Sequence, residues 1–255
     1  MKRAFAISLL FLTISAFGQI PDYFGMNQKW MVFSSCEEGI PECQLETDRI
    51  YFVDGDTDMV STGELYWIIR EQGRSMYTLE DTLIPSFCEG EFVFNNLAAL
   101  LRQEGRKIYR YNFNDDTDEL LYDFTLEEGD TLPITWLQIY GDVEITEVDS
   151  FMAAGQWLRT YETNSEEIEF IIEGVGHERG FLEPMYTTTD GCEYDHLCYW
   201  VDGTIQWSND IPLPGLTCNE AVSIDEELVA QPQILVFPNP ANQTIYLKGE
   251  LPAQH

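Results

Sequence analysis

Lysine and arginine are scarce in this sequence of 255 residues. There are 13 of them against 45 aspartates and glutamates, and the formal net charge is −32 at pH 7. A surface with this charge repels nucleic-acid phosphates and anionic lipid, because both are bound through basic patches. The composition therefore predicts no nucleic-acid partner. It suits solubility outside the cell, and it attracts divalent cations.

The common catalytic motifs are also absent. The sequence has neither His-Glu-x-x-His nor Gly-x-Ser-x-Gly, and its three histidines are His177, His196 and His255. The sequence therefore offers few residues for nucleophilic catalysis. The glycine-bounded segment around His177 predicts an exposed turn. Asp195 and His196 could imitate an orienting acid and its base, but no serine or free cysteine is marked as their nucleophile.

Carboxylates are abundant instead, and a glycosidase uses two of them, one protonated and one ionised. With 45 acidic residues, two carboxylates that are close in sequence carry almost no information. Glu173 follows the apolar pair Ile171-Ile172 and is the first candidate for the acid of a secreted, glycosidase-type hydrolase. The alternative places Glu173 at a strand end, hydrogen-bonded to the adjoining turn. We assign no catalytic residue and favour a non-catalytic role.

Two acidic segments partly match calcium loops. The first carries oxygen ligands at alternate positions, namely Asp54, Asp56 and Asp58. The match then fails, because Met59 stands where a calcium loop has glycine and Leu65 where it has glutamate. Residues 112–118 are similarly acidic and similarly incomplete. We expect two solvated hairpin turns, with a calcium-stabilised adhesion module as the alternative. No other cofactor is indicated.

Aromatic residues could form a platform that stacks on sugar rings. The candidates are Tyr66, Trp67, Trp136, Trp157, Trp200 and Trp207. Aromatic side chains in an antiparallel sheet more often pack across strands or into the core. We therefore expect most of the six in the core.

Helix signals are nearly absent, and strand signals dominate. Hydrophobic residues make up 44% of the chain, so a sizeable core is available. Short segments rich in β-branched and aromatic residues alternate with turn residues. They are residues 29–34, 49–53, 65–70, 107–113, 120–125, 143–148, 167–172 and 197–201. This spacing predicts an all-β fold, an antiparallel meander that forms a barrel or a sandwich. Only residues 91–103 could host a helical turn, although Phe92-Val93-Phe94 favours a strand.

Turn signals support the meander. Asp202-Gly203 predicts a two-residue hairpin turn, because both residues tolerate a positive φ. Residues 70–77 and 102–109 repeat the pattern Arg-x-x-Gly-Arg-x-x-Tyr. We interpret each copy as a strand end, a glycine turn at Gly73 or Gly105, and a return strand. Chance resemblance between hairpins and duplication explain the repeat equally well.

Six cysteines are present: Cys36, Cys43, Cys88, Cys192, Cys198 and Cys218. In a chain with a signal peptide, which residues 1–18 predict here, an even number of cysteines predicts disulfides, although six cysteines allow 15 connectivities. We expect the pairs Cys36–Cys43, Cys88–Cys192 and Cys198–Cys218. The alternative is a metal site formed by Cys192, His196 and Cys198.

The N-terminal residues 1–18 have the form of a cleaved signal peptide. Met1-Lys2-Arg3 is positively charged, residues 4–17 are almost wholly apolar, and Ala16-Phe17-Gly18 supplies small residues for cleavage before Gln19. The apolar run is too short for a transmembrane anchor, and no later segment could span a bilayer. The sequence therefore predicts a body domain over residues 19–218 that is secreted.

A change of composition follows Cys218. Residues 219–233 are acidic and poor in aromatics, which is typical of an exposed linker. In residues 234–255, Pro238, Asn239 and Pro240 impose an extended and stiff entry, because proline restricts its own φ and the residue before it. Residues 244–248 then alternate as a strand does. We expect this strand to begin a separate unit.

This tail resembles the start of the C-terminal type A sorting domain of proteins exported by the bacterial type IX secretion system. The residues that carry the resemblance are Val236-Phe237-Pro238-Asn239-Pro240-Ala241-Asn242 and Thr244-Ile245-Tyr246-Leu247. It implies a small β-sandwich tail, of which only the first strand is present, and so an incomplete reading frame. The resemblance also implies a partner, the type IX machinery, and a place outside the cell or on the outer-membrane surface.

The body resembles a recurrent all-β module that precedes such tails and for which no reaction is implied. Residues 101–109, 120–131 and 172–176 carry this likeness. The expectation for the whole chain is a secreted or cell-surface module with a binding or structural role. Its ligand would be an extracellular glycan or a protein.

Overall fold

The computed structural model describes residues 21–24, 27–37, 43–59, 63–79, 90–139, 141–186, 191–209 and 218. Only the backbone is described at residues 37, 43, 56–59, 78 and 79. The predicted signal peptide (1–18), linker (219–233) and sorting motif with its strand (234–255) lie outside these residues, as does Cys88. The predictions for those segments stay predictions.

The described chain consists of strands in two antiparallel sheets and contains no helix. The first sheet contains β1 (Gln28–Glu37), β2 (Cys43–Met59), β3 (Leu65–Leu79), β4 (Glu91–Glu104), β5 (Lys107–Asn112), β6 (Thr117–Asp123), β11 (Cys192–Val201) and β12 (Thr204–Ser208). The second contains β7 (Ile145–Ala153), β8 (Gln156–Thr163), β9 (Phe170–Ile172) and β10 (Gly176–His177). The predicted all-β class is confirmed. The sheets do not close into a barrel.

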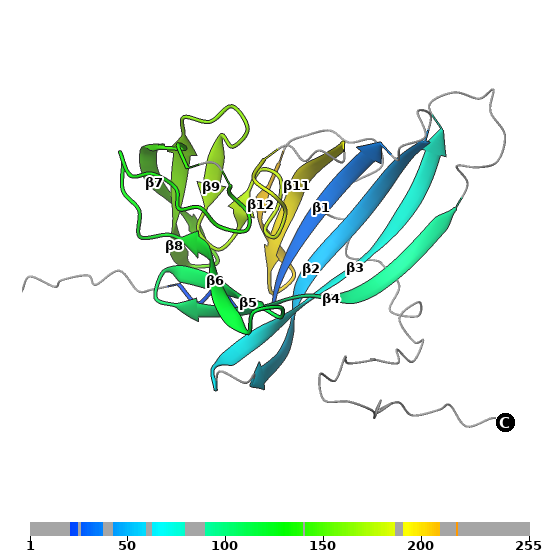
Figure 1. Cartoon of the computed structure of the whole chain (residues 1–255), viewed down its shortest axis with the longest axis horizontal. Coiled ribbons are helices and arrows are strands. Elements are labelled where there is room, and N and C mark those ends of the chain that lie inside the picture. The colour runs from blue at the N-terminus through cyan, green and yellow to red at the C-terminus, as the bar shows by residue number, and fades with distance from the viewer. Residues whose placement is uncertain are drawn as a thin grey trace, which may run out of the picture.

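The eight strands of the first sheet lie in the order β12-β11-β1-β2-β3-β4-β5-β6. Strands β1 to β6 form the predicted meander, and β11 returns to pair with β1. The second sheet, in the order β10-β9-β8-β7, is inserted before that return. It lies beside one end of the first sheet, and the long strands β2, β3 and β4 extend beyond it (Figure 1).

One hydrophobic core joins the two sheets. Trp30 and Ile69 enter it from the first sheet, and Leu158 and Ile171 enter it from the second. The Trp30 ring stacks on Phe181 with centroids 4.4 Å apart, in the segment that follows β10. No helix in the described residues is long and apolar enough to cross a membrane.

Residues 91–103 belong to a strand, so a helical turn there is wrong. Ala99 and Leu101 of β4 lie in the main core. Leu100 points to the opposite face and packs with Tyr66 and Tyr111. A strand buried on both faces has a continuous apolar run rather than an alternating one. This explains why the Leu97–Leu101 segment did not indicate a strand.

Gly73 and Gly105 occupy different structures despite their similar sequence context. Gly105 lies in the turn between β4 and β5 with a φ of +61°, as expected. Gly73 lies inside β3, so the predicted turn there is wrong. A Cβ at Gly73 would lie 2.0 Å from the backbone oxygen of Asp48 and 2.7 Å from Cζ of Phe94. Gly73 thus allows close approach of a neighbouring backbone and the Phe94 ring.

We expect Gly73→Ala to lower the free energy of unfolding by about 2 kcal/mol, because the backbone of Asp48 cannot move aside without disturbing β2. Gly90→Ala is the matched control, since its Cβ would lie no nearer than 3.4 Å to Phe92. The control should change stability by less than about 0.5 kcal/mol. Urea unfolding of both variants measures the difference, and equal stabilities would contradict this reading of β3.

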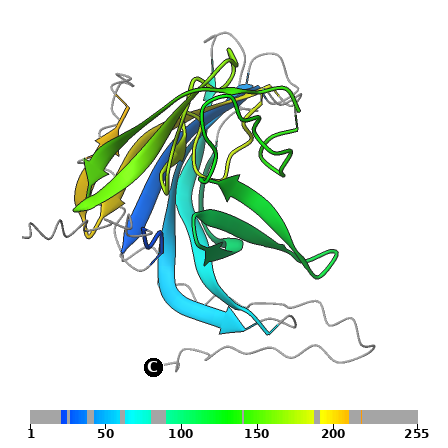
Figure 2. The same ribbon diagram turned by 90° about the vertical axis from the view of Figure 1, so that its left-hand side faces the viewer.

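Two of the three other hairpin turns that the sequence predicts are confirmed. Asp202 and Gly203 have φ values of 49° and 73° in the turn between β11 and β12. Residues 113–116 turn between β5 and β6. The segment that begins at Asp54 is not a turn, because it continues β2 through a bulge between Val53 and Thr57. A bulge bends its strand, and β2 bends near this end (Figure 2).

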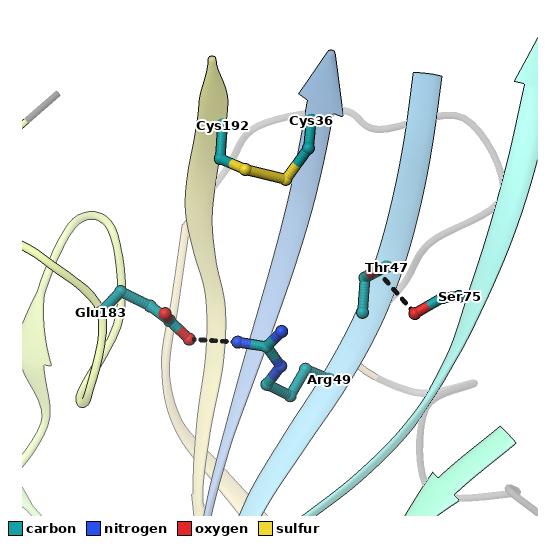
Figure 3. The surroundings of a disulfide bond; sticks show 6 residues. All are labelled: Cys36, Thr47, Arg49, Ser75, Glu183 and Cys192. Atoms are coloured by element: carbon teal, nitrogen blue, oxygen red, sulfur yellow. Dashed lines mark hydrogen bonds and ion pairs between the residues drawn. A yellow bond between two sulfur atoms is a disulfide. The ribbon is translucent and has the colours of Figure 1, made fainter. Parts of the chain in front are cut away.

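In the described part of the chain, two disulfide bonds involve strands of the first sheet. Cys36 bonds Cys192 and joins β1 to β11 (Figure 3), so the predicted pairs Cys36–Cys43 and Cys88–Cys192 are wrong. The strand register places Cys36 directly opposite Cys192, which the loop around Cys36 did not reveal. The predicted Cys198–Cys218 bond is confirmed. A metal site with Cys192 and Cys198 as ligands is wrong, because disulfide sulfur is not available as thiolate.

Candidate functional site

Glu173, the weak candidate for a catalytic acid, follows β9 in the turn before β10. Its side chain has no exposed surface. The guanidinium of Arg106 lies 2.7 Å from Oε1 and 2.6 Å from Oε2. The backbone amide of Arg159 donates to Oε2 at 2.9 Å, and the hydroxyl of Tyr23 donates to Oε1. Each carboxylate oxygen therefore accepts two hydrogen bonds.

This arrangement keeps Glu173 as an acceptor. Burial raises the pKa of Tyr23 above its usual value, and the adjacent Glu173 charge raises it further. Tyr23 therefore stays protonated and donates. Both carboxylate oxygens already accept hydrogen bonds from protein groups and the side chain has no exposed surface, so Glu173 is not placed to pass a proton to a substrate. The carboxylate instead ties the N-terminal segment to the β4–β5 turn and to β8.

Glu183 is a second buried acid, which the sequence reasoning missed. It is 4% exposed, and its Oε1 lies 3.0 Å from Nη1 of Arg49 (Figure 3). Tyr51 donates to the same oxygen at 2.5 Å. Burial raises the pKa of Glu183, whereas the Arg49 charge lowers it. The apolar neighbours Phe181-Leu182 were the only sequence signal for this burial.

His177 and His196 are both fully buried, so the predicted exposure of His177 is wrong, although residues 178–179 do form a turn there. Nε2 of His177 donates to the backbone oxygen of Glu183 at 3.1 Å. Nδ1 of His196 donates to the backbone oxygen of His177 at 3.1 Å. Burial lowers the pKa of His177 to about 3 and that of His196 to about 4. Both rings are neutral structural donors at pH 7.

Asp195 and His196 do not form a catalytic pair. They are consecutive residues of β11, so their side chains point to opposite faces of the sheet. His196 contacts Trp207, with ring centroids 4.8 Å apart. The ring nitrogen that an orienting acid would contact donates to a backbone oxygen instead.

The calcium candidates do not form a ligand cluster in the described part of the chain. Asp54 makes an ion pair with Arg70 at 2.7 Å. Asp56 and Asp58 lie in β2, where only their backbone is described. Among the described residues, no group of three or more His, Cys, Asp and Glu side chains could hold a metal ion.

The aromatic candidates divide as expected, with most of them in the interior. Tyr66 is 0% and Trp200 3% exposed, and Trp67 and Trp207 are partly buried against the main core. Two candidates remain at the surface, Trp136 at 45% and Trp157 at 61% exposure. Exposed tryptophans are the side chains here that suit contact with a ligand, since the buried acids are already paired.

Comparisons with family models, with curated proteins and with solved structures found no match to this chain. Any inference about the function of the site therefore rests on its residues alone. Two buried carboxylates, Glu173 and Glu183, are each bound by an arginine and a tyrosine. Two buried histidines hold the segment after β10 against β11. These groups stabilise the fold, and the exposed aromatic side chains provide the candidate surface for contact with a ligand.

Proposed function

We propose that the chain is a secreted or cell-surface β module with a non-catalytic binding role. The observation that carries this proposal is that both carboxylate oxygens of Glu173 already accept hydrogen bonds from protein groups. A glycosidase acid must release its proton to a leaving group in a cleft, whereas the Glu173 carboxylate has no exposed surface and accepts from Arg106, Arg159 and Tyr23. The best acid candidate in the sequence therefore supports a structural rather than a catalytic role.

The disulfides support a place outside the reducing cytoplasm. Cys36–Cys192 and Cys198–Cys218 tie β1, β11 and the chain after β12 together, and such bonds persist in oxidising compartments. We further propose export by the type IX route. This proposal rests on the resemblance of the tail at Pro238, Asn239 and Pro240 and on the signal-peptide pattern of residues 1–18.

A turnover assay tests the non-catalytic role. The protein is incubated with a panel of glycans and peptides, and products are measured by chromatography. We expect no turnover above that of a heat-denatured sample. Turnover by the folded protein that is lost in a folded Glu173→Gln variant would overturn the proposal in favour of a hydrolase.

Export is tested separately, by expression of the complete gene in a bacterium with an intact type IX system and in one that lacks it. We expect the protein on the surface or in the medium of the first and in the periplasm of the second. The same distribution in both strains would contradict the type IX proposal.

A further inference from the structure

Trp136 is presented at the surface by a short and well-anchored turn. The hydroxyl oxygen of Thr135 accepts hydrogen bonds from the amides of Leu137 and Gln138, both at 3.1 Å. The amide of Thr135 donates to the backbone oxygen of Gln138 at 2.7 Å. Leu137 has no exposed surface, and its backbone oxygen accepts from Met185 at 2.8 Å. The turn therefore holds the 45% exposed Trp136 in place, which lowers the entropy lost on binding.

Arg110 of β5 stacks on this tryptophan. Its guanidinium carbon lies 4.0 Å from the centroid of the Trp136 ring. The register places Arg110 opposite Glu119 of β6, but within the described chain the two side chains form no ion pair. Glu119 instead accepts a hydrogen bond from Asn112 at 2.6 Å. Burial lowers the pKa of Arg110, although a guanidinium keeps its charge and its five N–H donors.

Most other cationic side chains of the sheets are used differently. Seven make ion pairs with carboxylates: Arg49, Arg70, Arg74, Arg102, Arg106, Lys107 and Arg159. Arg110 makes none with the described residues, despite 45 acids in the chain. A flat aromatic ring with an adjacent set of N–H donors suits a ligand that has an apolar face and hydroxyl oxygens.

The charge of the chain favours one class of ligand. Exposed acids occur at both ends of the 128–144 segment: Glu128, Asp130, Asp142 and Glu144. They repel a polyanion, as does the net charge of −32. A protein partner of standard size covers about 800 Å² of this surface and would desolvate such carboxylates. A sugar ring needs little more than the indole and leaves them hydrated.

We propose that Trp136 and Arg110 form a binding site for an uncharged, hexose-based polysaccharide. The ring C–H groups of one sugar stack on the face of the indole that Arg110 does not cover, and Arg110 donates hydrogen bonds to the hydroxyl oxygens of a neighbouring sugar. The proposal rests on the proposed binding role and names the ligand class and the site for it.

Isothermal titration calorimetry tests the site with soluble neutral oligosaccharides from β-glucan, mannan and galactan, and with an acidic set from alginate and pectin. We expect the protein to bind at least one neutral set and neither acidic one. Trp136→Ala should weaken that binding at least tenfold, and Arg110→Ala about fivefold, with unchanged circular dichroism. Trp157→Ala is the matched control, since it removes a tryptophan on β8 that is more exposed than Trp136, at 61% against 45%, and its affinity should stay within twofold.

Three results would overturn the site. They are equal affinity of Trp136→Ala and the unmodified protein, binding of acidic sets alone, and no glycan binding at all. If Trp157→Ala loses binding instead, the glycan site lies on β8 and the binding role stands. If a protein partner competes through Trp136 and no glycan does, the binding role stands and the glycan proposal fails. Hydrolysis of a bound glycan would contradict the binding role itself.

Discussion

Glu173→Ala is expected to lower the free energy of unfolding by about 4 kcal/mol. The variant removes the partner of the Arg106 guanidinium and leaves its charge without compensation in a largely buried place, since Arg106 is only 22% exposed. It also leaves the Tyr23 hydroxyl and the Arg159 amide without their acceptor. Each unsatisfied buried donor adds to the cost. Urea unfolding followed by tryptophan fluorescence measures the loss.

The matched control is Glu127→Ala. Glu127 also binds an arginine, with Oε2 at 2.9 Å from Nη2 of Arg159, but its side chain is 71% exposed. Exposed ion pairs contribute little, so the control should change stability by less than about 1 kcal/mol. Similar losses for the two variants would mean that burial does not determine the importance of Glu173. The structural role assigned to this acid would then be wrong.

The double variant Arg106→Leu/Glu173→Leu separates two explanations of that loss. If the loss comes from the charge left behind on Arg106, removing both partners should be less destabilising than Glu173→Ala alone. A double variant at least as unstable as the single one would instead indicate that the hydrogen bonds of Tyr23 and Arg159 dominate.

Local sequence patterns predicted parts of several strands. β-branched and aromatic segments between turn residues identified most of β1, all of β5 and half of β11, and Asp202-Gly203 identified the β11–β12 turn. They failed where tertiary neighbours decide the outcome. Gly73 and Gly105 have similar local sequences, but only Gly73 lies against the ring of Phe94. No local pattern contains that contact.

Burial of polar residues could not be predicted for a related reason. Arg106 lies 67 positions from Glu173, and Cys192 lies 156 positions from Cys36. The strand order brings Cys36 and Cys192 together, because β11 pairs with β1 although the second sheet lies between them in the sequence. The sequence marked Glu173 because an apolar strand precedes it. It marked His177 as exposed because glycines flank it, and the same glycines let the chain fold inward there.

Acidification is expected to destabilise the protein through His177 and His196. His177 accepts a hydrogen bond on Nδ1 from the amide of Arg179 at 3.3 Å and donates through Nε2. A proton added at Nδ1 would face another N–H group. For His196 the cost is mainly that of charging a ring without exposed surface. The neutral forms are therefore the stable ones in the folded protein.

The direction follows from proton binding. The unfolded chain takes up protons on both histidines below a pKa of about 6.5, whereas the folded protein does so only near pH 3 and pH 4. Between these limits the unfolded state binds more protons, so stability falls as the pH falls. The two groups together should remove about 4 kcal/mol between pH 7 and pH 5.

Nearby carboxyl groups oppose this loss, so the test compares a variant with the unmodified protein. Burial raises the pKa of Glu178 and of Glu183, and a raised carboxyl pKa means that the folded state gains protons first and is stabilised by acid. Urea unfolding at pH 7, 6 and 5 gives the slope for each protein. His196→Gln should lose about half of the histidine contribution, roughly 2 kcal/mol over this range. Because Glu178 and Glu183 remain in the variant, a slope that His196→Gln does not alter would show that the buried imidazoles do not control the acid response.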